Sequence, residues 1–141
     1  MIIKESIFIN APMQKVWETF TDLTCWMDWN TVISNIRSEE NCLMHGKAIK
    51  CCFRPFLFPI KVQIKIEEMV PYERIVWSAR KRGLFAFHEF LFERQEKGLL
   101  VTSKETFSGL LAGASGFLLP ERRMRSLTKI FLKDLKKASE V

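Results

Sequence analysis

Within residues 58–68, every second position from Phe58 to Ile66 is apolar, and this alternation restricts the fold more than any other pattern in the chain. The apolar side chains are Phe58, Ile60, Val62, Ile64 and Ile66. Successive side chains of a strand point to opposite faces, so the pattern predicts a strand with one dry and one wet face. A sheet made of such strands needs a second layer over its dry face.

Further strands are predicted on both sides of this one, because short runs of similar character alternate with turn-forming residues. They cover residues 2–9, 31–40, 47–54, 74–80, 84–94 and 99–108. Between the first two strands, Asn10 is expected to cap a helix with one apolar stripe, and Asp22 a second short helix that ends at Trp29-Asn30. The stripe of the first helix consists of Met13, Val16, Trp17 and Phe20.

The C-terminal segment changes to helical spacing, with an apolar stripe from Met124 to Ala138. Pro120 either starts this helix or kinks a longer one, and we favour a long helix from about residue 114 that is kinked at Pro120. The predicted fold is α+β, with a curved antiparallel sheet of about seven strands around this helix, all within one domain, 1–141. Because one helix cannot fill a strongly curved sheet, a pocket is expected between them.

Several motifs resemble a known group of proteins. Near the N-terminus they are Ala11-Pro12, Val16-Trp17, Asp22 and Trp26-x-x-Trp29-Asn30. Later in the chain they are Gly83-x4-His88-x-Phe90-x-Phe92 and Glu105-x-Phe107-x-Gly109-Leu110-Leu111. The chain resembles the START-like, Bet v 1-like (SRPBCC) superfamily, in particular its polyketide cyclase/dehydrase branch. The resemblance covers nearly the whole chain and implies a helix-grip fold. Members bind lipids, polyketides, hormones or quinones, and many catalyse nothing, so the resemblance does not name a function.

The strongest local prediction concerns His88 and Glu105. Thr102, Lys104 and Thr106 form the outward polar set of strand 99–108, so Glu105 should face inward. A two-residue loop at Glu96-Lys97 would pair positions whose numbers sum to 193, which places His88 opposite Glu105. A carboxylate in a dry pocket is costly unless it is paired or protonated, so we expect a raised pKa for Glu105.

This pair could serve as general acid and base on an enolisable ligand. Alternatively, the two groups satisfy each other, or one of them binds a ligand without chemistry, and we favour this second interpretation. The expected ligand-binding set contains both groups and eight further residues. These are Trp29, Asn30, Trp77, Phe90, Phe107, Met124, Leu127 and Phe131. Trp29 and Asn30 are expected near the mouth of the pocket, although Trp29 fits the core equally well.

Other classes of site are not supported by the sequence. The four cysteines form no Cys-x-x-Cys pair and only two histidines are present, so we expect no metal site and no cofactor. Nucleic-acid motifs are missing, and no apolar run approaches the roughly 20 residues that span a bilayer. Residues 1–10 lack the pattern of a secretory signal, so a cytoplasmic location is expected.

The net charge of +6 comes largely from the C-terminal segment, where seven basic residues lie between Arg122 and Lys137. They fit one solvated helix face, or a surface that docks on an acidic partner or a membrane. The sequence therefore leaves three functions open. The first is binding of an apolar small molecule, lipid-like or aromatic. The alternatives are a cyclase or dehydratase that uses His88 and Glu105, and an interaction module that uses the basic helix.

Overall fold

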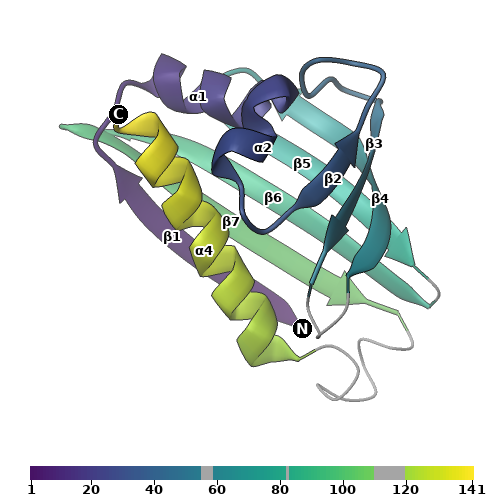
Figure 1. The fold of residues 1–141 in the computed structure, drawn as a ribbon. Helices are drawn as coiled ribbons and strands as arrows, with labels where there is room; N and C mark the ends of the chain where they lie inside the picture. The colour runs from purple at the N-terminus through teal and green to yellow at the C-terminus, as the bar shows by residue number, and fades with distance from the viewer. Residues whose placement is uncertain (55–58, 82, 110–119) are drawn as a thin grey trace.

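The computed structural model describes residues 1–54, 59–81, 83–109 and 120–141. Seven antiparallel strands form one curved sheet around a long helix, as predicted (Figure 1). The strand order is β1-β7-β6-β5-β4-β3-β2. In chain order the elements are β1 (Ile2–Ile9), α1 (Met13–Thr21), the 3-10 helix η1 (Leu23–Cys25), α2 (Trp26–Trp29), β2 (Ser34–Arg37), β3 (Ala48–Phe53), β4 (Ile60–Val70), β5 (Arg74–Lys81), β6 (Leu84–Gln95), β7 (Gly98–Ser108) and α4 (Glu121–Ser139).

The predicted alternation and register hold in the central strands. Ile64 and Ile66 of β4 are buried, whereas Lys61, Gln63 and Lys65 are exposed. In the hairpin of β6 and β7, the pairing runs to Gln95 opposite Gly98, which leaves the two-residue loop that the sequence predicts. Phe58 lies outside the described residues, so its predicted inward position is not described.

The two short helices lie over one end of the sheet and pack against the C-terminal part of α4 (Figure 1). The predicted cap at Asp22 is confirmed, because its Oδ1 accepts the N–H of Thr24 at 3.0 Å. The predicted cap at Asn10 is wrong. Pro12 occupies the N-cap of α1 without a side-chain cap, and the N–H of Asn10 instead donates to Oε2 of Glu140 at 2.8 Å.

The long helix α4 begins at Glu121, so the predicted kink at Pro120 is wrong. Pro120 has an extended backbone, with ψ of 105°, and precedes the first helical residue. A proline fits this place because the first helical turn leaves its N–H groups unpaired. Residues 110–119, which include the predicted helix start near residue 114, lie outside the described residues.

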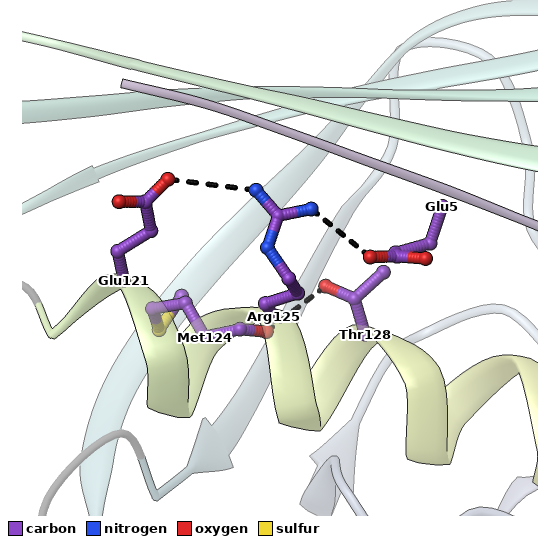
Figure 2. Close-up of polar contacts among 5 residues, drawn as sticks. All are labelled: Glu5, Glu121, Met124, Arg125 and Thr128. Carbon is purple, nitrogen blue, oxygen red and sulfur yellow. Dashed lines mark hydrogen bonds and ion pairs between the residues drawn. The ribbon is translucent and has the colours of Figure 1, made fainter.

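Polar contacts attach α4 to the edge strand β1. Arg125 donates to Oε1 of Glu5 on β1 at 3.0 Å, and its other terminal nitrogen lies 3.5 Å from Glu121 (Figure 2). Met124 and Thr128 flank Arg125 in the helix, and the hydroxyl of Thr128 donates to the carbonyl of Met124 (Figure 2). Arg125 is thus engaged within the fold, while the side chains of Met124 and Thr128 are buried.

The core is not evenly filled. An aromatic cluster packs between α1, α2, the sheet and the middle of α4. Its members are Phe20, Trp26, Trp77, Phe90 and Phe131, and their ring centroids lie within 4.8 to 6.3 Å of one another in contacting pairs. Next to this cluster, under the first turns of α4, the side chains leave a cavity.

Candidate functional site

A cavity of about 120 Å³ lies between the sheet and the N-terminal half of α4. Its wall is largely apolar, which is typical of small-molecule sites. Eight of the ten residues proposed from the sequence line it, namely Trp77, His88, Phe90, Glu105, Phe107, Met124, Leu127 and Phe131. Side chains from strands β3 to β7 contribute to the wall, along with one face of α4.

His88 and Glu105 are polar residues of this wall, which also includes Arg80, Lys81 and Thr128. His88 and Glu105 lie directly opposite each other on β6 and β7, as the predicted register requires. Nδ1 of His88 is 3.4 Å from Oε2 of Glu105, and the two side chains are only 12% and 15% exposed. On its other side, the ring of His88 contacts Ser103 through Nε2, at 2.6 Å from the hydroxyl oxygen.

Burial shifts the pKa values of both groups toward their neutral forms. Desolvation raises the pKa of Glu105 to about 8, as expected from its inward position, and lowers the pKa of His88 to about 3. These shifts favour a protonated carboxyl at neutral pH, and its O–H can donate to Nδ1 of His88, which lies 3.4 Å away. The imidazole then carries its proton on Nε2 and donates to the oxygen of Ser103.

Aromatic rings hold the imidazole in this orientation. The ring of His88 stacks on Phe90 with centroids 4.1 Å apart, and it meets the edge of Trp77 at 5.4 Å. Both aromatic residues also line the cavity. The hydrogen-bonding direction of His88 is thus set by packing as well as by its polar partners.

Ser103 is a site residue that the sequence analysis missed. Alternation places it inward, but it lies opposite Phe90 and reaches His88 only diagonally. The order serine, histidine, carboxylate is also that of a hydrolytic triad. Here the serine is fully buried and does not line the cavity, and the carboxyl is protonated, so this arrangement orients His88 instead of activating a nucleophile.

The cavity meets solvent at the end of β5. Arg80 and Lys81 line it and are exposed, and Leu84 beside them is half-buried. Cys51 lies deeper in the wall, where burial raises the pKa of its thiol to about 12, so it stays protonated. Val32 and Ile33, which belong to no predicted site, also line the cavity.

Trp29 and Asn30 are not among the side chains that line the cavity. Trp29 packs on Trp26 and Phe131, with ring centroids at 6.0 and 5.5 Å. The buried Asn30 accepts two backbone N–H groups through Oδ1, from Val32 and Ile33, each at 2.9 Å. The position expected at the pocket mouth therefore stabilises the turn that carries Val32 and Ile33 into the wall.

Two further predictions concern metals and surfaces. In the described ranges, no group of three histidine, cysteine, aspartate or glutamate side chains could hold a metal ion. Among the same residues, no helix is long and apolar enough to cross a membrane.

On α4, Lys136 contacts Glu140 and the carbonyl of Phe8, whereas Lys129 and Lys133 are exposed. Docking through the basic helix stays a prediction.

Comparison with known proteins gives a family and a fold. The family model described as "Polyketide cyclase / dehydrase and lipid transport" matches residues 2–140. No curated protein matches the sequence significantly.

Solved structures match the fold over nearly the whole chain. TTHA0849 from Thermus thermophilus is 13% identical with a TM-score of 0.80, and the match covers 99% of this chain and 97% of that one. Protein CV1439 from Chromobacterium violaceum is 21% identical with a TM-score of 0.73, over 100% and 99% of the two chains. Ara h 8.0201 is 13% identical with a TM-score of 0.75, over 99% and 97%.

Proposed function

Because the chain belongs to the polyketide cyclase/dehydrase and lipid transport family, within the START-like, Bet v 1-like superfamily, we propose that it binds an apolar small molecule in the cavity between the sheet and α4. The observation that carries this proposal is the cavity itself, an apolar space of about 120 Å³ beside a tightly packed core. Natural cores leave few such voids, because an empty cavity forfeits packing energy.

The polar wall of the cavity restricts the ligand. A protonated Glu105 and a neutral His88 add no net charge to the site. The carboxyl O–H can donate to a carbonyl or hydroxyl oxygen of the ligand, and the aromatic rings of Trp77 and Phe90 offer apolar faces. The best fit at this wall is a lipid-like or aromatic group that carries one oxygen acceptor.

Cavity filling tests this proposal. Ala86 lines the cavity, so Ala86→Phe should fill it and weaken binding of the neutral fluorescent probe N-phenyl-1-naphthylamine by more than about tenfold. Ala48 is exposed on β3, so Ala48→Phe adds the same ring outside the cavity and should leave binding unchanged. Equal affinity in the wild type and the Ala86→Phe variant would refute the cavity as the binding site.

A second candidate function is supported by the contact between His88 and Glu105 inside the cavity. Burial leaves Glu105 as an acid and His88 as an unprotonated base. A ligand carbonyl that accepts the hydrogen bond of Glu105 would free Nδ1 of His88 to accept a proton from the adjacent carbon. This is the first step of an enolisation, as in cyclase or dehydratase chemistry.

Hydrogen–deuterium exchange tests this candidate without knowledge of the natural substrate. The protein should accelerate exchange at the acidic carbon of 2-tetralone in D2O, and Glu105→Gln should abolish the acceleration while leaving affinity for the ketone similar. If the wild-type protein does not accelerate exchange, the acid–base role is rejected and the binding function stands.

A further inference from the structure

A second hollow, of about 550 Å³, lies over the ends of β3, β4 and β5 and next to β2. Five cations line it, namely Arg37, Lys50, Lys61, Arg80 and Lys81. Its other described lining residues are Asn35, Cys51, Cys52, Val62 and Gln63, so no carboxylate belongs to the described part of its wall. We call this hollow the basic recess.

The strand register places positive charges against each other in the basic recess. Arg37 of β2 lies directly opposite Lys50 of β3, and Lys61 lies opposite Cys52 one row away. Like charges in opposite positions destabilise a sheet. Within the described residues, no carboxylate lies within ion-pair distance of Arg37, Lys50 or Lys61. An anion bound between them would relieve this repulsion.

The sheet opens beside the basic recess. Among the described residues, the ladder between β4 and β5 runs from Ile64 opposite Ala79 to Val70 opposite Arg74. Beyond Ile64, residues 60–63 of β4 pair with β3, and the end of β5 pairs with β6. The side chain of Lys81 crosses this opening and donates to the carbonyl of Lys61 at 2.6 Å.

The basic recess and the cavity lie on a shared stretch of wall beside this opening. Four residues line both spaces, namely Cys51, Val62, Arg80 and Lys81. One molecule could therefore reach from the apolar wall of the cavity to the cations of the basic recess. The two spaces differ sharply in chemistry, since the cavity is lined mainly by apolar side chains and the recess by five cations.

We propose that the basic recess binds the anionic head group, a phosphate or carboxylate, of an amphiphile whose apolar part occupies the cavity. This inference rests on the proposed function and adds the class of ligand. Lysine and arginine are suited to such oxyanions because their N–H groups form charge-assisted hydrogen bonds. The shared wall is the reason to assign the anion to the molecule in the cavity.

Three probes measured by calorimetry separate the possible sources of the anion, namely octyl phosphate, 1-octanol and inorganic phosphate. The wild-type protein should bind octyl phosphate at least about tenfold more tightly than either other probe. The double variant Arg37→Gln/Lys50→Gln should lose about tenfold in affinity for octyl phosphate and none for 1-octanol. Lys15→Gln/Lys97→Gln removes the same charge at exposed positions outside the recess and should change neither affinity.

The outcomes distinguish the two proposals. Equal affinities for octyl phosphate and 1-octanol, unchanged in the Arg37→Gln/Lys50→Gln variant, would overturn the head-group site but leave the cavity as a binding site. Inorganic phosphate that binds as tightly as octyl phosphate would show an anion site that is independent of the cavity, which also overturns the proposal. Failure of both octyl compounds to bind would reject apolar ligand binding in the cavity, and the head-group site with it.

Discussion

Nδ1 of His88 and Oε2 of Glu105 lie 3.4 Å apart, and burial shifts the pKa values of these two groups in opposite directions. The carboxyl keeps its proton up to about pH 8, and the imidazole stays neutral down to about pH 3. The cavity therefore holds two strong hydrogen-bonding groups without a charge. This state suits an apolar ligand, because neither of these two groups is an ion that must be desolvated when the ligand enters.

The free energy of unfolding should depend on pH through both groups. From pH 4.5 to about 8, folded Glu105 keeps a proton that the unfolded chain has released, so rising pH favours unfolding. From pH 6.5 down to about 3, His88 binds a proton in the unfolded chain but stays neutral in the folded protein, so falling pH favours unfolding. The contribution of this pair should be largest between pH 4.5 and 6.5, where the two slopes cancel.

Urea unfolding between pH 3 and pH 9 measures this profile. The free energy of unfolding should rise with pH below pH 4.5 (the acidic limb) and fall above pH 6.5 (the alkaline limb). Each limb should have a slope of up to about 1.4 kcal/mol per pH unit. Glu105→Gln should flatten the alkaline limb, and His88→Asn should flatten the acidic limb. A Glu105→Gln variant whose profile matches the wild type above pH 6.5 would show that Glu105 is ionised in the folded protein.

Removal of the Ser103 hydroxyl should destabilise the fold by about 1–3 kcal/mol, because it leaves a buried N–H of His88 without a partner. Ser6→Ala is the matched control. Its hydroxyl contacts that of Thr102 at 2.9 Å between β1 and β7, on the outer face of the sheet, where Ser6 is exposed, so the loss should stay below about 1 kcal/mol. Similar losses in the two variants, measured by urea unfolding, would contradict the role assigned to Ser103.

Asn30→Ala should lower the free energy of unfolding by about 2–3 kcal/mol, since two backbone N–H groups lose their acceptor. Asn30→Asp keeps an oxygen that can accept both N–H groups, so it should lower the free energy of unfolding by less. Nδ2 of Asn30 has no partner among the described residues, so its removal forfeits no hydrogen bond. Thermal unfolding of the two variants checks this difference, and an alanine variant as stable as the wild type would be evidence against the structural role of Asn30.

Two glycines with positive φ should respond differently to alanine. Gly109 has φ of +105°, and a Cβ there would lie 2.3 Å from the carbonyl oxygen of Gly83, so Gly109→Ala requires the backbone to move. Gly46 has φ of +80° but nothing within 4 Å of a Cβ, so Gly46→Ala should cost only about 1–2 kcal/mol. Chemical denaturation should show the larger loss for Gly109→Ala.

Much of the fold and part of the candidate site could be predicted because they depend on local rules. Alternation sets the face on which each side chain of a strand lies, so the inward positions of Trp77 and Glu105 follow from their neighbours in sequence. A two-residue hairpin loop fixes the register of β6 and β7, which is why the pair of His88 and Glu105 could be predicted without a structure.

Predictions that failed concern the ends of elements, where several conformations satisfy the same local rules. A proline can begin a helix or kink one, and the sequence around Pro120 permits both. An asparagine shortly before a helix is a common cap, but here the N–H of Asn10 donates to Glu140 and Pro12 takes the N-cap position.

By itself, the sequence determined the order of elements, the dry face of the sheet and the register of its hairpin, because each depends on residues a few positions apart. Only the tertiary structure decided which distant side chains meet. The entry of Val32 and Ile33 into the wall and the opening between β4 and β5 depend on how distant parts of the sheet and α4 pack. These result from long-range packing across the whole sheet, which no local pattern encodes.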